Sequence, residues 1–171
     1  SSEDKVFGYI PDSDDLPIRE DADYLYICKN NTIYGTAFHT LPNTKGKNLV
    51  ADVSSCFLSE PEKLTDYGIL WGGVQKNVGP AGMAIAVVRE DLIGDCLPGT
   101  PTMLRYETYA AHGSLYNTPP CYNIYICGKV FRWIKALGGL TAMQKRNEEK
   151  AALLYDFLDQ SKLFSNPVRR E

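Results

Sequence analysis

The chain has 171 residues, of which 44% are hydrophobic and 23% charged, and this composition suits one globular domain with a substantial core. Its net charge of −3 and pI near 5.4 give no electrostatic reason to expect nucleic acid or an anionic membrane as a partner. We see no signal peptide and no apolar run near the roughly 20 residues of a membrane helix. Five cysteines without CxxC pairs argue against a zinc site or a disulfide framework, so we expect a soluble protein of the reducing cytoplasm.

The first 52 residues predict short strands separated by polar loops. Residues 1–23 are polar and predict a surface loop. Asn30 and Asn31 suit a turn, and Asp52 stands at the C-terminal end of a strand. The segments with strand-like composition are residues 6–10, 24–28 (a buried strand), 36–41 and 49–51.

Two more strands and a short helix are expected in the middle of the chain. Residues 54–67 connect to them, with one helical turn after Pro61, a residue that suits the start of a helix. The strands at 69–71 and 83–88 flank a glycine-rich loop. A short helix is predicted near residues 90–97.

The C-terminal part is predicted to be helical. One or two helical turns fall at residues 105–111, and the loop HGSLYNTPP follows at 112–120. Residues 121–137 predict a long helix that ends at a Gly-Gly pair, with Trp133 in the core. Residues 141–158 predict a second long helix with Met143, Ala151, Leu154 and Leu158 along one stripe. Buried strands followed by long helices indicate an α/β fold with a largely parallel sheet.

The glycine-rich loop carries the residue of greatest chemical interest. In the sequence GILWGGVQKNVGPAG, residues 68–82, Lys76 follows a buried strand in a loop whose glycines let backbone approach a ligand closely. A desolvated lysine has a lowered pKa and can attack a carbonyl to form a Schiff base. The alternative is that Lys76, one of eleven lysines, is an ordinary solvated surface charge.

Three polar residues follow predicted strands, at the edge of a parallel sheet where ligands collect: Thr32, Asp52 and Lys76. Thr32 could instead be a turn residue, and Asp52 could cap the following segment with Ser54. An aspartate followed 24 residues later by a lysine is also what a pyridoxal-phosphate enzyme needs. The lysine holds the cofactor aldehyde, and the aspartate keeps the pyridine nitrogen protonated. The spacing is suggestive and leaves both interpretations open.

Four motifs carry a resemblance to a known family: ADVSS (51–55), YGILWGGVQKNVGPAG (67–82), VVREDL (87–92) and YNTPP (116–120). They resemble phosphoserine aminotransferase, a fold-type-I pyridoxal-phosphate enzyme of the class V aminotransferases, which acts in serine biosynthesis. The resemblance runs through nearly the whole chain. It implies the large domain of that fold, with a mainly parallel sheet and flanking helices.

The resemblance implies a role for six residues. It implies Lys76 as the catalytic lysine that bonds the cofactor, Asp52 as the partner of the pyridine nitrogen, and Thr32 as a cofactor contact. It implies Gln75 as a ligand of the cofactor phosphate. The resemblance further implies a homodimer in which Asn117 and Thr118 reach the cofactor of the neighbouring subunit. No metal is expected.

The family is about twice as long as this chain, so we expect a fragment of the large domain. The expected division is a strand and loop core at about 1–98, a linker with the NTPP loop at 99–120, long helices at 121–161, and the start of the small-domain region at 162–171. The phosphate-binding loop, the ring-stacking tryptophan and the substrate-binding residues would lie elsewhere in a full-length protein. The fragment alone is therefore expected to be inactive.

The implied reaction moves an amino group from glutamate to 3-phosphohydroxypyruvate, giving 2-oxoglutarate and phosphoserine. Lys76 would move the proton as general base and acid. Two alternatives stay open. One is another fold-type-I enzyme, such as a different aminotransferase or a desulfurase. The other is a non-catalytic scaffold that forms dimers.

Overall fold

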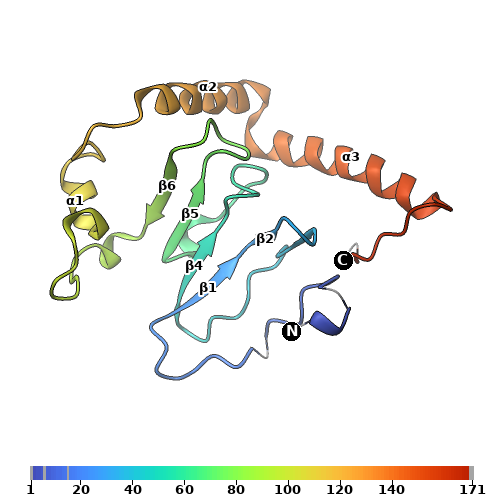
Figure 1. Ribbon diagram of the computed structural model, residues 1–171, viewed down its shortest axis with the longest axis horizontal. Helices are drawn as coiled ribbons and strands as arrows, with labels where there is room; N and C mark the ends of the chain where they lie inside the picture. Colours follow the sequence, from blue (N-terminus) through green and yellow to red (C-terminus); the bar gives the residue numbers. More distant parts are fainter. Residues whose placement is uncertain (1, 6, 15, 170–171) are drawn as a thin grey trace.

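The computed structural model describes residues 2–5, 7–14 and 16–169 as a central sheet with helices along one end and one side. In Figure 1 the sheet lies in the middle, α2 crosses above it and α3 extends to the right. The two ends of the described chain lie close together at the lower right. They are joined there by a backbone hydrogen bond of 2.9 Å from Arg169 N–H to the Gly8 carbonyl.

Within the described residues, the main sheet has four strands in the order β1-β4-β5-β6. These strands are β1 (Tyr24–Cys28), β4 (Asn48–Asp52), β5 (Ile69–Gly73) and β6 (Ala84–Val88). The first three run parallel, and β6 pairs with β5 in the antiparallel sense. The expected α/β fold with a largely parallel sheet is confirmed. Because β1, β4 and β5 are parallel, their C-terminal ends meet at one edge, with Asp52 in register between Cys28 and Trp71.

A small hairpin follows β1 and corrects one prediction. Asn30 and Asn31 form strand β2 (Asn30–Asn31) rather than a turn, and β2 pairs with β3 (Thr36–Ala37). The turn falls at residues 32–35 because Asn31 Oδ1 accepts the N–H groups of the second and third residues after it. Gly35, with φ of +76°, closes this turn in a conformation that glycine adopts most easily. The extended segment expected at 36–41 is thus limited to β3.

The core lies mainly between the sheet and its connections. One buried cluster consists of Ile27, Leu49, Ala51, Val53, Tyr67 and Leu70. A second buried cluster joins Val74 and Val78, in the loop after β5, to Cys127 of α2. The second cluster packs the glycine-rich loop against α2, so the loop has a defined position at the edge of the sheet.

The helices are α1 (Tyr106–Ala111), α2 (Cys121–Leu137) and α3 (Gly139–Gln160). The bounds predicted for α2 are confirmed, and Gly138 ends it with φ of 111°, the left-handed conformation expected at a helix C-terminus. Helix α3 begins two residues earlier than predicted. Short 3-10 helices lie at Glu3–Lys5, Leu64–Asp66, Glu90–Leu92 and Thr102–Leu104. The turn at Leu64–Asp66 is the one expected after Pro61, whereas the helix expected at 90–97 is limited to Glu90–Leu92.

Three burial and strand predictions are wrong. Strand β1 is mostly exposed, because Ile27 is its buried residue while Tyr24 and Tyr26 are 56% and 46% exposed. Trp133 is 51% exposed instead of lying in the core, since α2 buries Cys127 and Ile134. The strand expected at 6–10 is not found in residues 7–10, and residue 6 lies outside the described residues.

Helix α3 buries Met143 of its predicted apolar stripe, while Leu154 is 57% exposed. Its charged residues Lys145, Arg146, Glu148 and Glu149 face water, as predicted. Among the described residues, no helix is both long and apolar enough to cross a membrane.

Candidate functional site

The loop after β5 presents three consecutive polar side chains. Val74 N–H donates to the Met83 carbonyl at 3.1 Å, and the N–H groups of Val78 and Gly79 both donate to the Val74 carbonyl. Val74 and Val78 are almost completely buried, which fixes the two ends of a single turn. Residues 75–77 between them are exposed, so Lys76 projects from a rigid base.

The Lys76 ammonium contacts residues from two other loops. Its Nζ donates to Thr32 Oγ1 at 2.8 Å and to Ser55 Oγ at 2.6 Å. The Thr32 and Ser55 hydroxyls also hydrogen-bond to each other. The turn of the β2–β3 hairpin, the segment after β4 and the loop after β5 therefore converge on one amine at the C-terminal edge of the parallel strands.

Asp52 lies at the same edge as the last residue of β4 and is half-buried. Its Oδ1 accepts the Ser54 N–H at 2.8 Å, so it caps the following segment, as the alternative interpretation of this residue expected. Among the described residues no hydrogen bond to Oδ2 is found. One carboxylate oxygen is thus committed to the loop, and the other can accept from a bound group.

The loop after β4 is held close against β5. Ser54 Oγ accepts the Gly73 N–H at 2.9 Å, and the Phe57 carbonyl accepts from Asn77 Nδ2 at 2.7 Å. A Cβ at Gly72 would lie 3.1 Å from the Ser54 nitrogen, so a larger residue there would push this loop away. Ser55 was missed as a site residue, although the ADVSS motif that contains it was recognised.

Three of the residues that the resemblance implies are not brought to the Lys76 amine. The Gln75 side chain is folded back, since a Cβ at Gly73 would lie 2.6 Å from Gln75 Oε1. Asn117 and Thr118 are exposed in the connection between α1 and α2, where Asn117 Nδ2 lies 3.5 Å from the Thr118 carbonyl. Figure 1 shows this connection beyond β6, at the opposite end of the sheet from β2.

The donor set of the site fits pyridoxal phosphate. A primary amine on a fixed turn can bond an aldehyde, and a carboxylate with a free oxygen can pair with a ring nitrogen. The expected desolvation of Lys76 is wrong, because the residue is exposed in this structure. Among the described residues, no cluster of three or more His, Cys, Asp or Glu side chains could hold a metal ion.

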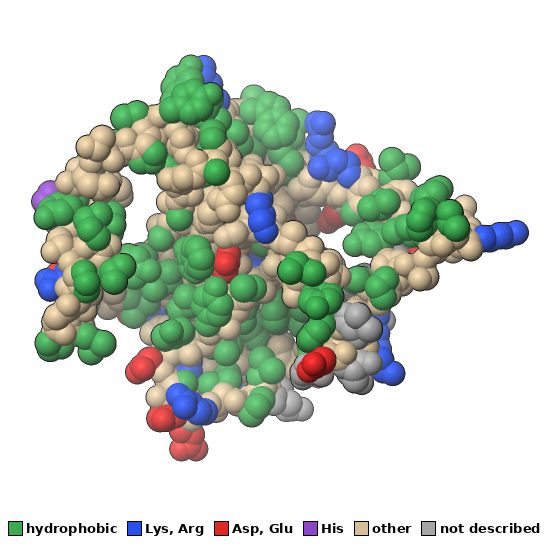
Figure 2. Space-filling model, in the orientation of Figure 1, with side chains coloured by type: hydrophobic (Ala, Val, Ile, Leu, Met, Phe, Trp, Pro, Cys, Tyr) green, Lys and Arg blue, Asp and Glu red, His purple; other side chains and the backbone are tan. Residues whose placement is uncertain are grey.

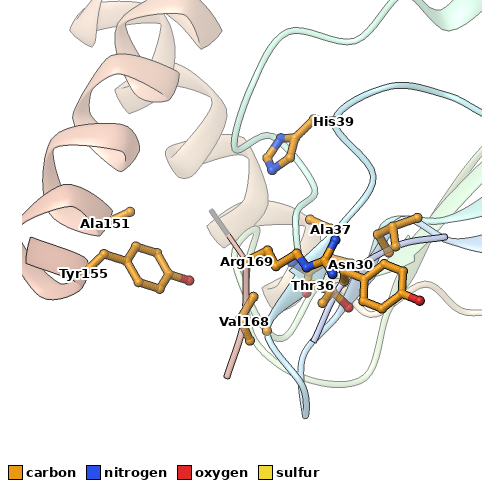
Figure 3. A pocket seen from close by; sticks show the side chains of 11 residues that line it. Asn30, Thr36, Ala37, His39, Ala151, Tyr155, Val168 and Arg169 are labelled. Carbon is orange, nitrogen blue, oxygen red and sulfur yellow. The ribbon is translucent and has the colours of Figure 1, made fainter. Parts of the chain in front are cut away.

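A cavity of about 340 Å³ lies away from Lys76, between the β2–β3 hairpin, α3 and the two ends of the described chain. In Figure 3 the side chains of His39, Arg169 and Tyr155 surround it. The Arg169 guanidinium lies 4.4 Å from the centre of the Tyr9 ring, which forms another part of the wall. None of the six residues that the resemblance implies lines this cavity, so it is separate from the candidate site.

Comparison with known proteins identifies the family. The family model described as "Aminotransferase class-V" matches residues 9–171. The chain belongs to the class V aminotransferase family. A curated relative, the phosphoserine aminotransferase of Streptococcus agalactiae, is 46% identical over 169 residues, which cover 99% of this chain and 46% of that protein. The chain therefore spans about half the length of the curated relatives it matches.

Solved structures agree with this class V assignment and with fold type I. A phosphoserine aminotransferase examined for radiation damage of its Schiff base matches with a TM-score of 0.90 at 42% identity, covering 94% of this chain and 44% of that one. The pyridoxal-phosphate-bound phosphoserine aminotransferase of Trichomonas vaginalis matches with a TM-score of 0.86 at 37% identity, covering 90% and 43%. The predicted family and the predicted fold type I are both confirmed.

Proposed function

We propose that this chain forms the cofactor-binding part of the large domain of a phosphoserine aminotransferase. The enzyme transfers an amino group from glutamate to 3-phosphohydroxypyruvate, giving 2-oxoglutarate and phosphoserine. The observation that carries this proposal is the convergence of Thr32 and Ser55 on the Lys76 amine, beside Asp52 on the neighbouring strand. Relatives 46% to 53% identical that are named phosphoserine aminotransferases support it.

Pyridoxal phosphate, when bound, supplies an aldehyde that takes up the amino group and an electron-withdrawing ring that eases loss of the substrate Cα proton. Lys76 would hold the cofactor through its Nζ, and the same amine would move that proton as general base and acid. Thr32 and Ser55 hold this amine in place through their hydroxyl oxygens, at 2.8 and 2.6 Å. The second oxygen of Asp52 would keep the ring nitrogen protonated, because a nearby anion favours the charged form.

The cofactor phosphate requires donors beyond those near Lys76. A dianionic phosphate is held by several preorganised donors, commonly N–H groups at the start of a helix or in a loop. In our proposal Gln75 swings from its position over Gly73 toward the phosphate. Further donors come from Asn117 and Thr118 of a second copy in a homodimer. The exposure of these two residues, at the far end of the sheet from β2, supports a role between subunits.

The same proposal divides the chain as the sequence suggested, with residues 1–98 as core, 99–120 as linker and NTPP loop, 121–161 as helices, and 162–171 leading to a small domain. The chain alone is expected to be inactive, because its described residues near Lys76 supply few donors for the phosphate. All five cysteines are free, which favours a reducing compartment, and we infer the cytoplasm.

Spectroscopy of the purified full-length protein tests the proposal. Loaded with pyridoxal phosphate, it should be yellow, and its visible absorbance should fall on addition of glutamate and return on addition of 3-phosphohydroxypyruvate. A response to glutamate without a response to this oxo acid would indicate another aminotransferase. A protein that stays colourless with excess cofactor would contradict the proposal and favour a non-catalytic scaffold.

A further inference from the structure

A buried lysine lies directly behind the loop that contacts Lys76. Lys29 follows β1, and its side chain is only 7% exposed. Its backbone extends the pairing of β1 with β4, since its N–H donates to the Asp52 carbonyl at 2.9 Å. On its other side, the Lys29 carbonyl accepts the Phe38 N–H at 2.8 Å. Lys29 is therefore fixed to the residue at which the loop after β4 begins.

The side chain of Lys29 is bound to the other end of the same loop. Its Nζ donates to Glu60 Oε1 at 2.8 Å and also to Glu62 Oε1. The second oxygen of Glu62 accepts the Tyr67 hydroxyl at 2.8 Å. We call Lys29, Glu60, Glu62 and Tyr67 the Lys29 cluster. Because one residue binds Asp52 through its backbone and Glu60 through its side chain, it joins both ends of residues 53–59.

The Lys29 cluster is charged despite its burial. Burial by itself would lower the pKa of the Lys29 ammonium, but the hydrogen bonds that it donates to Glu60 and Glu62 raise that pKa above its ordinary value. An ion pair of this kind contributes little net stability compared with apolar side chains of similar size, whereas removing one partner is costly. Its distinctive property is the fixed geometry that the buried donors and acceptors impose.

The loop between those two ends carries the groups that position the amine. Ser55 accepts the hydrogen bond from Lys76, and the Phe57 carbonyl accepts from Asn77, the neighbour of Lys76. A third attachment comes from α3, where Asn147 Nδ2 donates to the Ser59 carbonyl at 2.9 Å. A change in the shape of residues 53–59 would therefore move the acceptors that orient Lys76.

We propose that Lys29 is a positioning residue for Lys76, acting through the loop at 53–59 that it closes with Glu60 and Glu62. This inference rests on the proposed function, because it concerns the geometry of the cofactor-bonding amine. The Lys29 ammonium binds Glu60 and Glu62, not Lys76. Loss of its ammonium loosens the loop, and Ser55 then no longer holds the Lys76 amine in the orientation that bonding and proton transfer require.

The test compares Lys29→Met with Lys63→Met in the full-length, cofactor-loaded dimer and in its apo form. Lys63 is the matched control because it forms an exposed ion pair with Asp66, with side chains 76% and 39% exposed, in the same stretch of chain. In Lys29→Met we expect faster hydrogen exchange at 53–59 in the apo protein and weaker pyridoxal-phosphate binding. We also expect a kcat about 10- to 100-fold lower with little change in KM. Lys63→Met should match the unmodified protein in all of these measurements.

Lys29→Arg provides the conservative comparison, since the guanidinium keeps the cation and its donors, and it should recover most of the lost kcat. If Lys29→Met is insoluble, Lys29→Met with Glu62→Gln replaces it, leaving only the more exposed Glu60 charged. Exchange and kcat equal to those of Lys63→Met would overturn the role of Lys29. An unmodified protein without transamination would instead refute the proposed function, and the exchange comparison in the apo form would still decide whether Lys29 fixes the loop.

Discussion

The C-terminal edge of the sheet and the pair of long helices bury their side chains to very different extents. At the sheet edge, Ala51, Val53, Leu70 and Val74 are at most 1% exposed. In α2 and α3, which are described throughout, the buried residues are Cys127, Ile134 and Met143. Leu153, Leu154 and Phe157 of α3 are between 57% and 78% exposed. Figure 2 shows apolar side chains gathered over this outer part of α3.

This difference in burial indicates which contacts stabilise each region. At the sheet edge, hydrogen bonds within this chain hold the Lys76 amine in a defined place. The helices present apolar surface of the kind that marks contact with other protein. In the proposed enzyme, the second subunit and the small domain would cover this surface. The following predictions test this contrast, beginning with the largest expected effect.

Replacing Lys76 with Ala should abolish the function of the sheet edge without unfolding it. We expect kcat to fall by about 10³-fold or more, because the cofactor-bonding amine and the proton shuttle are lost together. Steady-state assays of the full-length protein measure this, with Lys63→Ala as the control for loss of an exposed lysine. Turnover in Lys76→Ala similar to that in Lys63→Ala would show that the chemistry lies elsewhere.

Truncating a leucine should lower the free energy of unfolding much more at the sheet edge than on α3. Leu70→Ala, at a side chain 1% exposed in β5, should lower the free energy of unfolding by about 2–5 kcal/mol. Leu153→Ala, at a side chain 78% exposed in α3, should change it by less than about 0.5 kcal/mol if α3 is free. Denaturant unfolding of the isolated chain and of the full-length dimer measures both. If α3 is covered in the dimer, Leu153→Ala should cost more there than in the chain alone.

Replacing Asp52 with Asn tests whether its second oxygen serves the cofactor. The amide nearly preserves the shape and can still accept the Ser54 N–H, so the protein should fold normally. The ring nitrogen should lose its proton, and we expect kcat to fall by about 10- to 100-fold. Near-normal activity would leave Asp52 with only its observed role, as the cap of the segment after β4.

The smallest expected effect concerns two thiols, one in each region. Burial raises the pKa of Cys56 from 9.0 to about 11, whereas Cys121 at the start of α2 is exposed. Near pH 8 the Cys56 thiolate is scarce, and we expect its alkylation to be about tenfold slower than that of Cys121. The rate at Cys56 should continue to rise with pH until about pH 11. Mass spectrometry after timed alkylation measures both, and equal rates at pH 8 would contradict the packing described for Cys56.

The positions of the strands around the site were predicted better from the sequence than the burial and contacts of individual side chains. Short apolar runs and turn residues placed β4, β5 and β6, and the Gly-Gly pair ended α2 at the right residue, because these signals are local. The exposure of Trp133 could not be predicted, since an apolar helix face looks the same whether this chain or another protein covers it. Ser55 was missed because its contact with Lys76 joins residues 21 positions apart through the fold.

The Lys29 cluster was not predicted for a similar reason. A lysine that follows a strand is predicted to be a solvated surface charge. The two glutamates that pair with Lys29 lie 31 and 33 residues further along the chain, so no local pattern links them to it. Thr32, Asp52 and Lys76 were selected because each follows a strand of a parallel sheet, where the topology brings strand ends together. The sequence pattern could not predict which hydroxyls accept hydrogen bonds from the Lys76 amine. It also could not predict which oxygen of Asp52 stays available to a bound group.

Borohydride reduction of the full-length protein, followed by peptide mapping, tests the central claim most directly. Reduction fixes pyridoxal phosphate to the amine that holds it, and the modified peptide then identifies the lysine by mass. We expect the cofactor on Lys76, the amine on which Thr32 and Ser55 converge. Cofactor fixed to any other lysine, or to none after loading with excess pyridoxal phosphate, would contradict the site described for this chain.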